Sequence, residues 1–405
     1  MKVWCLLRDQ FAHVRPVESA FNGNAEFIFD ELWDPATLVN NRPDIVLCVN
    51  DYPYDVVRCL DAARQAGIPS LLLQDGILEW RCQYHNPLFG AGGGAPQHQP
   101  VMTDKIACIG HQSARQIAAW GNAAKVETTG MPRLDHLFER KSLSIQKPGS
   151  RILVMTAKNP GFTAEQRELT LGSLKDVKVH LESLAGVEVL WRVSKSVAVE
   201  LGVENQLDQI SSSELAKVLE QVDAVITTPS TAMLEAMLLG RPVAALDYHN
   251  APRFLQTAWT ISAQTHISLT IAELLNPPAA KIAFQQDCLA DSLECSGSAA
   301  ERVCDLMGKM VSASQEMRQK GWQLNLPHDL LGQQGTFHTF GRPPLSALYE
   351  GQSLFHETSL EALQVRLARA ENENERLKSE NAELKKRVQL GSWFKQGVRH
   401  LTQAK

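Results

Sequence analysis

The chain has 405 residues, and 40 Lys and Arg against 45 Asp and Glu give it a net charge of −5. Hydrophobic residues make up 44% and charged residues 21%, which is the composition of a folded globular protein and excludes disorder as its main state. An acidic balance offers no general attraction for nucleic acid, so no nucleic-acid partner is expected.

The apolar runs and the cysteines indicate a cytoplasmic protein. No segment approaches the ~20 uninterrupted apolar residues that span a bilayer, and the run Val3–Leu7 is stopped by Arg8, too early for a secretory signal. The eight cysteines form no Cys-x-x-Cys pair, so reduced thiols are expected rather than disulfides or a zinc site.

Up to about residue 310, short apolar runs alternate with longer amphipathic ones. The runs are continuous rather than alternating, which is typical of parallel strands covered by helices on both faces. The spacing therefore predicts an α/β protein. The predicted strands are Val3–Leu7, Phe27–Phe29, Ile45–Val49, Leu71–Leu73, Ile106–Ile109, Ile152–Met155, Val187–Trp191, Ala224–Thr227 and Val243–Leu246. The predicted helices include Val56–Ala66, Ser113–Trp120, Glu165–Leu184, Ser213–Gln221 and Ala232–Leu239.

A Lys-Pro-Gly-Ser stretch at 147–150 separates two halves of the size of one doubly wound domain. We therefore expect two Rossmann-like domains facing a cleft, an N-terminal one over 1–148 and a C-terminal one over 149–320. A linker over 321–358 follows. Ligands of such sheets bind beyond the carboxyl ends of the strands.

The segment after the strand that ends at Thr227 is the most informative. A Pro-Ser-Thr turn leads into a helix that stops at Gly240, with Ser230 or Thr231 placed as the N-cap. Free N–H groups at this turn suit a phosphate, and Glu235, one helical turn after Thr231, could accept both hydroxyls of a ribose. The same pattern also fits a well-capped helix with a solvated Glu235.

Two motifs carry a family resemblance. Ser-Thr-x-x-x-Glu-Ala at 230–236 with Gly-x-Pro-Val at 240–243 resembles the donor-binding element of GT-B glycosyltransferases and their relatives. Those relatives include UDP-N-acetylglucosamine 2-epimerases and CDP-glycerol glycerophosphotransferases. Gly-x-Pro-x-x-Asp at 130–135 is similar to the stretch by which these families leave their N-terminal domain. The resemblance implies a nucleotide-sugar substrate, no separate cofactor and no bound metal.

Asp75 is the predicted catalytic base, because it directly follows a buried strand in the first domain. Its stretch resembles the acidic-acidic-Gly motif of bacterial sialyltransferases and polysialyltransferases, with Gln74 in place of the first acid. Asp75 could instead cap the turn before Glu79. Asp51 and Glu79 are reserves on the acceptor side.

Cations near the carboxyl ends of the second set of strands are candidates for the departing phosphate. Arg192 and Lys195 stand where the resembled sialyltransferases carry a His-Pro pair, which is missing here. Lys158 follows the strand that ends at Met155, and His249 is a further donor-side candidate, although an ordinary loop histidine is the simpler interpretation.

The C-terminal region changes character from residue 359. Over 359–390, apolar and Asn residues at a and d positions with oppositely charged g and e residues predict a parallel coiled-coil homodimer through residues 360–388. The amphipathic tail 391–405, with Trp393 and Phe394 beside Lys395 and Arg399, suits weak docking on an anionic membrane at the inner face of the plasma membrane, or on a protein.

The leading prediction is a metal-independent glycosyltransferase that adds a sugar from a nucleotide-sugar donor to a bacterial surface glycan or glycolipid, such as a capsule or O-antigen. A sugar 2-epimerase, a glycerophosphotransferase and a non-catalytic nucleotide-sugar-binding scaffold remain as alternatives.

Overall fold

The computed structural model describes residues 1–87, 96–138, 151–157, 161–206 and 214–333, together with 367–368, 370–382 and 385 of the tail. The chain divides into two compact units, Met1–Arg342 and Pro343–Lys405. Both sheets belong to the first unit. Lys158 lies outside the described residues, as do most of the predicted coiled coil and the whole of 391–405.

The first sheet is parallel throughout, and we call it and its helices the first lobe. Its strand order places β1 between β2 and β3, so the chain changes direction across the sheet at β1 and β3. In spatial order the strands are β2 (Glu26–Asp30), β1 (Lys2–Leu6), β3 (Ile45–Cys48), β4 (Ser70–Leu73), β5 (Lys105–Cys108) and β6 (Val126–Thr128).

The second sheet is also parallel and defines the second lobe. Its order changes direction at β7 and β9, which lie side by side. In spatial order the strands are β11 (Trp259–Ile261), β10 (Val243–Leu246), β9 (Ala224–Thr227), β7 (Arg151–Met155) and β8 (Glu188–Arg192). The nine predicted strands are all present within one residue at each end. The two remaining strands, β6 and β11, were not predicted.

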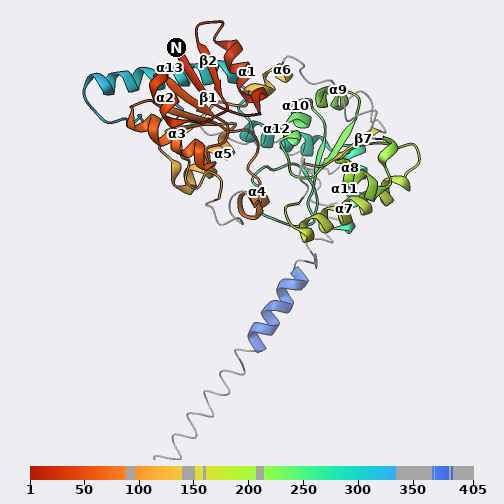
Figure 1. The fold of residues 1–405 in the computed structure, drawn as a ribbon. Helices are drawn as coiled ribbons and strands as arrows, with labels where there is room; N and C mark the ends of the chain where they lie inside the picture. Colours follow the sequence, from red (N-terminus) through yellow and green to blue (C-terminus); the bar gives the residue numbers. More distant parts are fainter. Residues whose placement is uncertain are drawn as a thin grey trace, which may run out of the picture. The chain divides into compact units, whose positions relative to one another are not determined.

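Helices connect the parallel strands, as the strand–helix alternation predicts (Figure 1). In chain order they are α1 (Phe11–Ala20), α2 (Pro35–Asn41), α3 (Tyr54–Gln65), α4 (Trp80–His85), α5 (His111–Ile117), α6 (Asp135–Phe138), α7 (Ala164–Glu182), α8 (Lys195–Leu201), α9 (Leu215–Leu219), α10 (Ala232–Leu238), α11 (Ile267–Leu275), α12 (Ala279–Ser292) and α13 (Ala299–Gln319).

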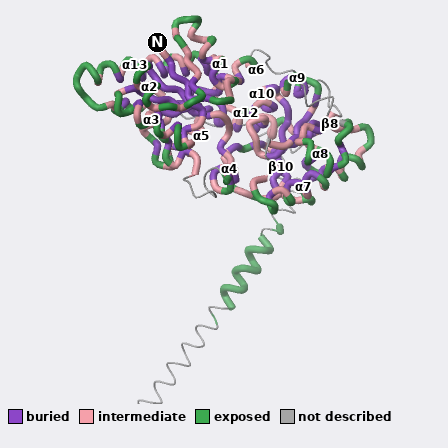
Figure 2. Tube along the Cα trace, in the orientation of Figure 1, coloured by how far each residue is buried: buried purple, intermediate pink, exposed green. Residues whose placement is uncertain are grey.

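Each sheet is buried on both faces, which explains the continuous apolar runs. In β1, Val3 and Cys5 pack into a core with α13, whereas Trp4 and Leu6 pack into the opposite core with α3. The second sheet likewise separates two apolar clusters. Figure 2 shows the buried residues concentrated in the strands of both sheets. All eight cysteines are free, and five of them are buried.

The last long helix, α13, returns to the first lobe. Its Val303, Leu306, Met307 and Met310 are buried against residues of β1 and β3. The Gly-x-Pro-x-x-Asp stretch receives its N-terminus: the Asp135 carboxylate accepts hydrogen bonds from the backbone N–H groups of Ala299 at 3.0 Å and Ala300 at 2.9 Å. Chain segments far apart in sequence therefore meet at this stretch.

Gly130 is required where they meet. Its φ is +87°, and a Cβ there would lie 2.7 Å from the carbonyl oxygen of Glu294 and 2.9 Å from the Cβ of Ala299. The Gly of the motif thus allows the returning chain to pass close to the backbone.

In the second unit, the described residues between 367 and 385 are helical and exposed. Leu367 and Leu377, which occupy predicted a and d positions, are 59% and 52% exposed in the single chain. No described helix is both long enough and apolar enough to cross a membrane.

Candidate functional site

The site lies at the carboxyl ends of the two sheets, near the strands where each sheet changes direction. Residues that follow β1, β3 and β4 come from the first lobe, and residues that follow β7, β9 and β10 come from the second. These are the positions where parallel sheets leave space for ligands.

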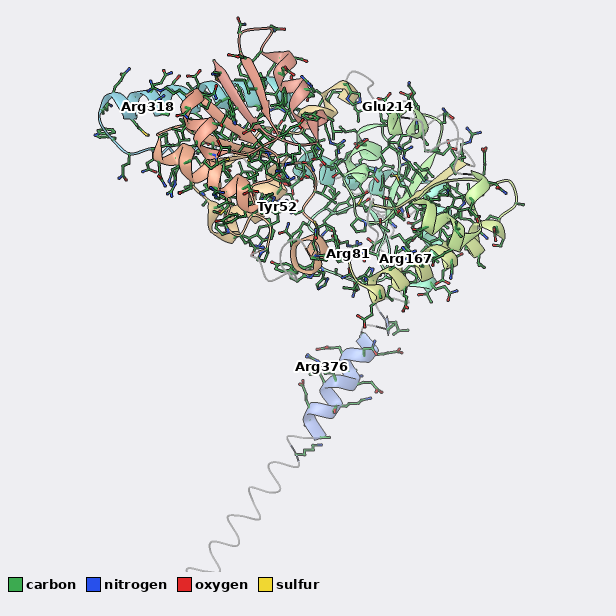
Figure 3. All side chains as sticks on the ribbon, in the orientation of Figure 1. Tyr52, Arg81, Arg167, Glu214, Arg318 and Arg376 are labelled. Atoms are coloured by element: carbon green, nitrogen blue, oxygen red, sulfur yellow. The ribbon has the colours of Figure 1, made fainter. Side chains whose placement is uncertain are left out.

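Asp75 follows β4 and is half-buried. Burial raises the pKa of its carboxyl above the usual range, while the charge of Arg133 acts in the opposite direction. Tyr52, labelled in Figure 3, follows β3; burial raises the pKa of its phenol, and the Asp75 charge adds to the rise. Arg133 and Tyr52 are therefore electrostatic neighbours of Asp75.

The turn that carries Asp75 is held in place by Gln74. The Gln74 amide donates to the carbonyl of Gly76 at 2.7 Å, and its oxygen accepts from the backbone N–H of Ile109 at 3.1 Å. Gln74 is 4% exposed. The side chain at the position of the missing first acid thus braces the turn, which leaves Asp75 as the carboxylate of this stretch.

The corner between β9 and α10 has a different environment from the one predicted. Thr231 is the N-cap residue, but its side chain makes no capping hydrogen bond. Its Oγ1 instead accepts from the backbone N–H of Ile77 at 3.3 Å, across the lobes. A Cβ on Gly76 would lie 2.6 Å from this oxygen, so Gly76 permits the approach of Thr231. The predicted stop at Gly240 is confirmed by its φ of +70°.

Ser230 offers a free polar group at this corner. Its Oγ is buried and has no hydrogen-bond partner among the described residues. Such groups are rare in folded proteins, because a buried hydroxyl has lost its hydrogen bonds to water.

Glu235 faces the first lobe. Its Oε1 accepts from Arg133 Nη1 at 3.0 Å, and the two side chains are 13% and 24% exposed. The carboxylate predicted to hold a ribose thus has a partner already. The charge of Arg133 also acts to lower the pKa of Asp75.

His13, in α1, belongs to the same surroundings. Burial, with a contribution from the Arg133 charge, lowers the pKa of His13 to about 4, so its imidazole is neutral at pH 7.

The two reserve carboxylates are engaged in local structure. Asp51 is 2% exposed and accepts from the backbone N–H of Met102 at 2.7 Å. Glu79 is the N-cap of α4: one oxygen accepts from the N–H of Cys82 at 2.7 Å and the other from Arg81 Nε at 2.5 Å. Glu79 therefore caps α4.

The donor-side candidates from the other loops are placed as follows. Arg192 ends β8 and is half-buried, whereas Lys195 begins α8 and is exposed. His249, after β10, pairs through Nε2 with Thr170 Oγ1 at 3.2 Å, and burial lowers the pKa of its imidazole. It is thus tied to α7.

Besides Arg133 and Glu235, a second set of polar residues lies where α4 meets the second lobe. Arg81 and Asp247 are 5% and 4% exposed, and burial raises the pKa of Asp247 while the charge of Arg81 opposes the rise. Figure 3 labels Arg81 on α4. A backbone bridge between Glu79 and Arg253 connects α4 with the loop after β10.

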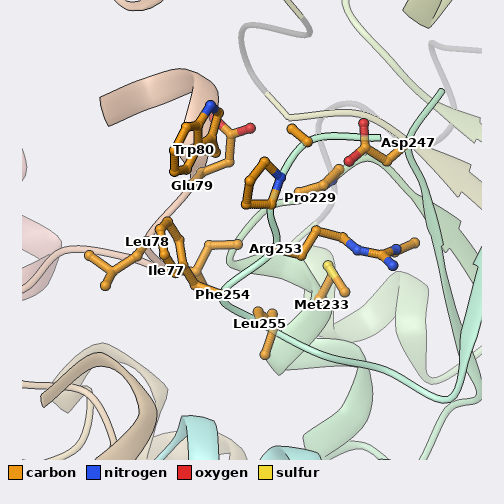
Figure 4. A pocket seen from close by; sticks show the side chains of 13 residues that line it. Ile77, Leu78, Glu79, Trp80, Pro229, Met233, Asp247, Arg253, Phe254 and Leu255 are labelled. Carbon is orange, nitrogen blue, oxygen red and sulfur yellow. The ribbon is translucent and has the colours of Figure 1, made fainter. Parts of the chain in front are cut away.

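A small cavity is lined by residues of both lobes (Figure 4). Its volume of about 10 Å³ is room for no more than a single water molecule, so the lobes are in contact here. The lining side chains are those of Ile77, Leu78, Glu79, Trp80, Pro229, Met233, Asp247, Pro252, Arg253, Phe254 and Leu255, with Ala245 and Ala251.

The sequence reasoning missed Arg133, His13, Tyr52 and Arg81. Arg133 stands inside the motif at 130–135 that was used only as the end of the first domain, so the motif itself was the available signal. His13, Tyr52 and Arg81 belong to no motif or spacing that would have singled them out in the sequence. Among the described residues, no group of three or more His, Cys, Asp or Glu is arranged to hold a metal ion.

No protein-family model matches the chain, and no curated protein matches its sequence. Solved structures do match its fold. The UDP-GlcNAc 2-epimerase of Methanocaldococcus jannaschii, in complex with UDP-GlcNAc and UDP, is 10% identical with a TM-score of 0.51, over 76% of this chain and 99% of that chain. The wall teichoic acid polymerase TagF is 14% identical with a TM-score of 0.51, over 78% of this chain and 90% of that chain.

At these identities the likeness establishes the fold, which is of the GT-B type, and it confirms the resemblance found in the motifs. It does not by itself assign a reaction.

Proposed function

We propose that this GT-B-fold chain is a metal-independent glycosyltransferase, which moves a sugar from a nucleotide-sugar donor to a bacterial surface glycan or glycolipid such as a capsule or O-antigen. The observation that carries the proposal is the ion pair between the lobes. Glu235 of the second lobe accepts from Arg133 of the first at 3.0 Å, and the charge of Arg133 also acts on Asp75, so we assign a base and a candidate pentose-binding carboxylate to one site.

Asp75 is the proposed general base. The acceptor hydroxyl loses its proton to the Asp75 carboxylate while its oxygen forms a bond to the anomeric carbon. The bond from that carbon to the donor phosphate breaks, and the nucleotide leaves with the electron pair. The raised pKa of a partly dry carboxyl suits this role, because a stronger base accepts the proton more readily.

The second lobe is the proposed donor side. Ser230, with its unpartnered hydroxyl, and Thr231 would contact phosphate oxygens, and Glu235 the pentose hydroxyls. Arg192, Lys195 and Lys158 follow neighbouring strands and would add positive charge, and His249 would stand at the edge of the site. Because Thr231 contacts Ile77 and the cavity between the lobes has a volume of only about 10 Å³, we infer that donor binding parts the lobes at this corner.

A 2-epimerase or a glycerophosphotransferase is the second candidate. It is favoured by the two matched structures, which are described as a UDP-GlcNAc 2-epimerase and a wall teichoic acid polymerase. A nucleotide-sugar-binding scaffold is the third candidate, supported by the missing His-Pro pair.

Turnover assays separate these candidates. Purified chain is incubated with UDP-, CMP-, CDP- and GDP-linked donors, with and without glycan acceptors, and the release of nucleotide and the configuration of the sugar are followed. We expect nucleotide release with one donor class, and a loss of roughly 100-fold or more in kcat for Asp75→Asn with nucleotide binding retained. Asp61→Asn is the matched control, because Asp61 is exposed and pairs with Arg64 on α3.

Each other outcome identifies another candidate. Conversion of UDP-GlcNAc to its C2 epimer without an acceptor identifies an epimerase, and glycerol phosphate transfer from a CDP-linked donor identifies a glycerophosphotransferase. Nucleotide binding without turnover of any donor identifies a scaffold and refutes the enzyme.

We also propose that residues 360–388 form the homodimer predicted from the heptads, with the tail 391–405 held weakly at the inner face of the plasma membrane or on a protein. The exposure of Leu367 and Leu377 in the single chain supports the dimer. Light scattering of the full chain should give twice the monomer mass, and a monomer would refute this part.

A further inference from the structure

Arg133 has more hydrogen-bonding capacity than the structure uses. A guanidinium carries five N–H donors in a fixed fork. One nitrogen, Nη1, donates to Glu235, whereas Nε is buried and has no partner among the described residues. An ion pair that served only to join the lobes would not require a buried N–H without an acceptor.

Arg133 pairs with one carboxylate, that of Glu235, and its buried Nε leaves an N–H donor for a second acceptor such as a phosphate oxygen. In a nucleotide, the pentose and the phosphate adjoin each other, so the groups that bind them must also be neighbours. Arg133 and Glu235 are neighbours, with 3.0 Å between Nη1 and Oε1.

Glu235 retains capacity for the pentose. A carboxylate offers about four acceptor positions on its two oxygens, and Arg133 occupies one position on Oε1. Both members of the pair can thus serve the same ligand at once. The planar fork of arginine matches two oxygens of a phosphate, which a lysine ammonium does not.

We propose that Arg133 binds a phosphate group of the nucleotide, so that the first lobe supplies a cation to the departing nucleotide. The proposal rests on the proposed function, because it needs a nucleotide in the cleft. It assigns a ligand-binding role to the motif at 130–135, whose Gly130 and Asp135 hold the returning helix α13.

The test compares nucleotides with their nucleosides. Dissociation constants are measured by titration calorimetry for UDP, CDP, CMP and GDP, and for uridine, cytidine and guanosine. The quantity of interest is the factor by which the phosphate improves binding. The variants are Arg133→Gln, Arg133→Lys and Glu235→Gln, with Arg58→Gln as the control, since Arg58 is half-exposed on α3.

For Arg133→Gln we expect the phosphate advantage to fall by roughly tenfold or more, while nucleoside binding stays nearly unchanged, because a charge-assisted hydrogen bond to phosphate is lost. Arg133→Lys should keep part of the advantage. Glu235→Gln should weaken nucleoside and nucleotide by a similar factor, and Arg58→Gln should change neither. Circular dichroism confirms that each variant is folded, and Arg133→Lys serves if Arg133→Gln does not fold.

Two contrary outcomes are distinguishable. If Arg133→Gln weakens nucleoside and nucleotide equally, or changes neither, Arg133 does not bind phosphate, and the proposed function stands without it. If the wild-type chain binds none of the four nucleotides, the proposed function fails and this inference fails with it.

Discussion

The contact between Asp135 and the start of α13 gives a prediction with a defined magnitude. Asp135→Ala removes the carboxylate that accepts from the N–H groups of Ala299 and Ala300 and from Ser298 Oγ. Loss of a capping side chain costs about 1 kcal/mol, and a hydrogen bond to a charged group contributes about 1.5–3 kcal/mol. Ser298 still caps the N–H of Glu301. We therefore expect Asp135→Ala to lower the free energy of unfolding by about 2–4 kcal/mol.

Urea unfolding followed by circular dichroism measures this change. Asp135→Asn, which keeps one acceptor oxygen, should lie between wild type and Asp135→Ala. The control is Asp305→Ala on the same helix, since Asp305 makes only an exposed pair with Lys309 and should cost about 0.5 kcal/mol or less. If Asp135→Ala unfolds at the same urea concentration as the control, the stretch at 130–135 does not anchor the returning helix.

Three further stability predictions follow from buried groups in the first lobe. Burial lowers the pKa of His98 to about 4, so between pH 6.5 and 4 the unfolded chain binds a proton that the folded chain excludes. The free energy of unfolding should therefore fall as the pH falls through this window. In urea unfolding measured at several pH values, His98→Gln should reduce the slope of the free energy of unfolding against pH. Lys105 and Glu127 form a pair that is 0% and 1% exposed, so Lys105→Met should cost about 3–5 kcal/mol by leaving a buried charge; a cost under about 1 kcal/mol would contradict this. Gly130→Ala should lower the free energy of unfolding by about 2 kcal/mol or more, because Gly130 has a positive φ and a backbone oxygen lies 2.7 Å from the new Cβ. Gly172→Ala in α7, where no atom lies within 4 Å of the new Cβ, should instead stabilise the protein by about 0.5–1 kcal/mol. Similar unfolding midpoints for the two glycine variants would refute the argument.

The sequence pattern was sufficient to predict most strands of the two sheets. A parallel strand that is buried on both faces requires a continuous apolar run, and few other structures do. β6 (Val126–Thr128) and β11 (Trp259–Ile261) were missed for a physical reason. Each has three residues and ends its sheet, so each carries a run too short to stand out.

The return of α13 to the first lobe could not be predicted either. Its apolar stripe identifies a helix with one buried face, but no local pattern tells which lobe that face will contact. The partner became clear only from Val303 and Leu306 in the core of the first sheet.

The candidate site also contains residues that the sequence could indicate and residues that only the structure reveals. Asp75 and Glu235 could be proposed from the sequence because each stands in a segment that follows the carboxyl end of a predicted strand. Arg133 could not, because its role depends on a contact between residues 102 positions apart, Arg133 with Glu235. The corner at Thr231 was expected to be open to a ligand, whereas in the structure the Thr231 hydroxyl accepts a hydrogen bond from the backbone N–H of Ile77 in the other lobe.

A crystal structure of the chain with the nucleotide that it binds most tightly tests the central claim most directly. We predict the pentose hydroxyls on the Glu235 carboxylate, a phosphate within hydrogen-bond distance of Arg133 and Ser230, and the hydrogen bond from Ile77 to Thr231 broken. A nucleotide bound elsewhere, with Thr231 still against Ile77, would contradict it.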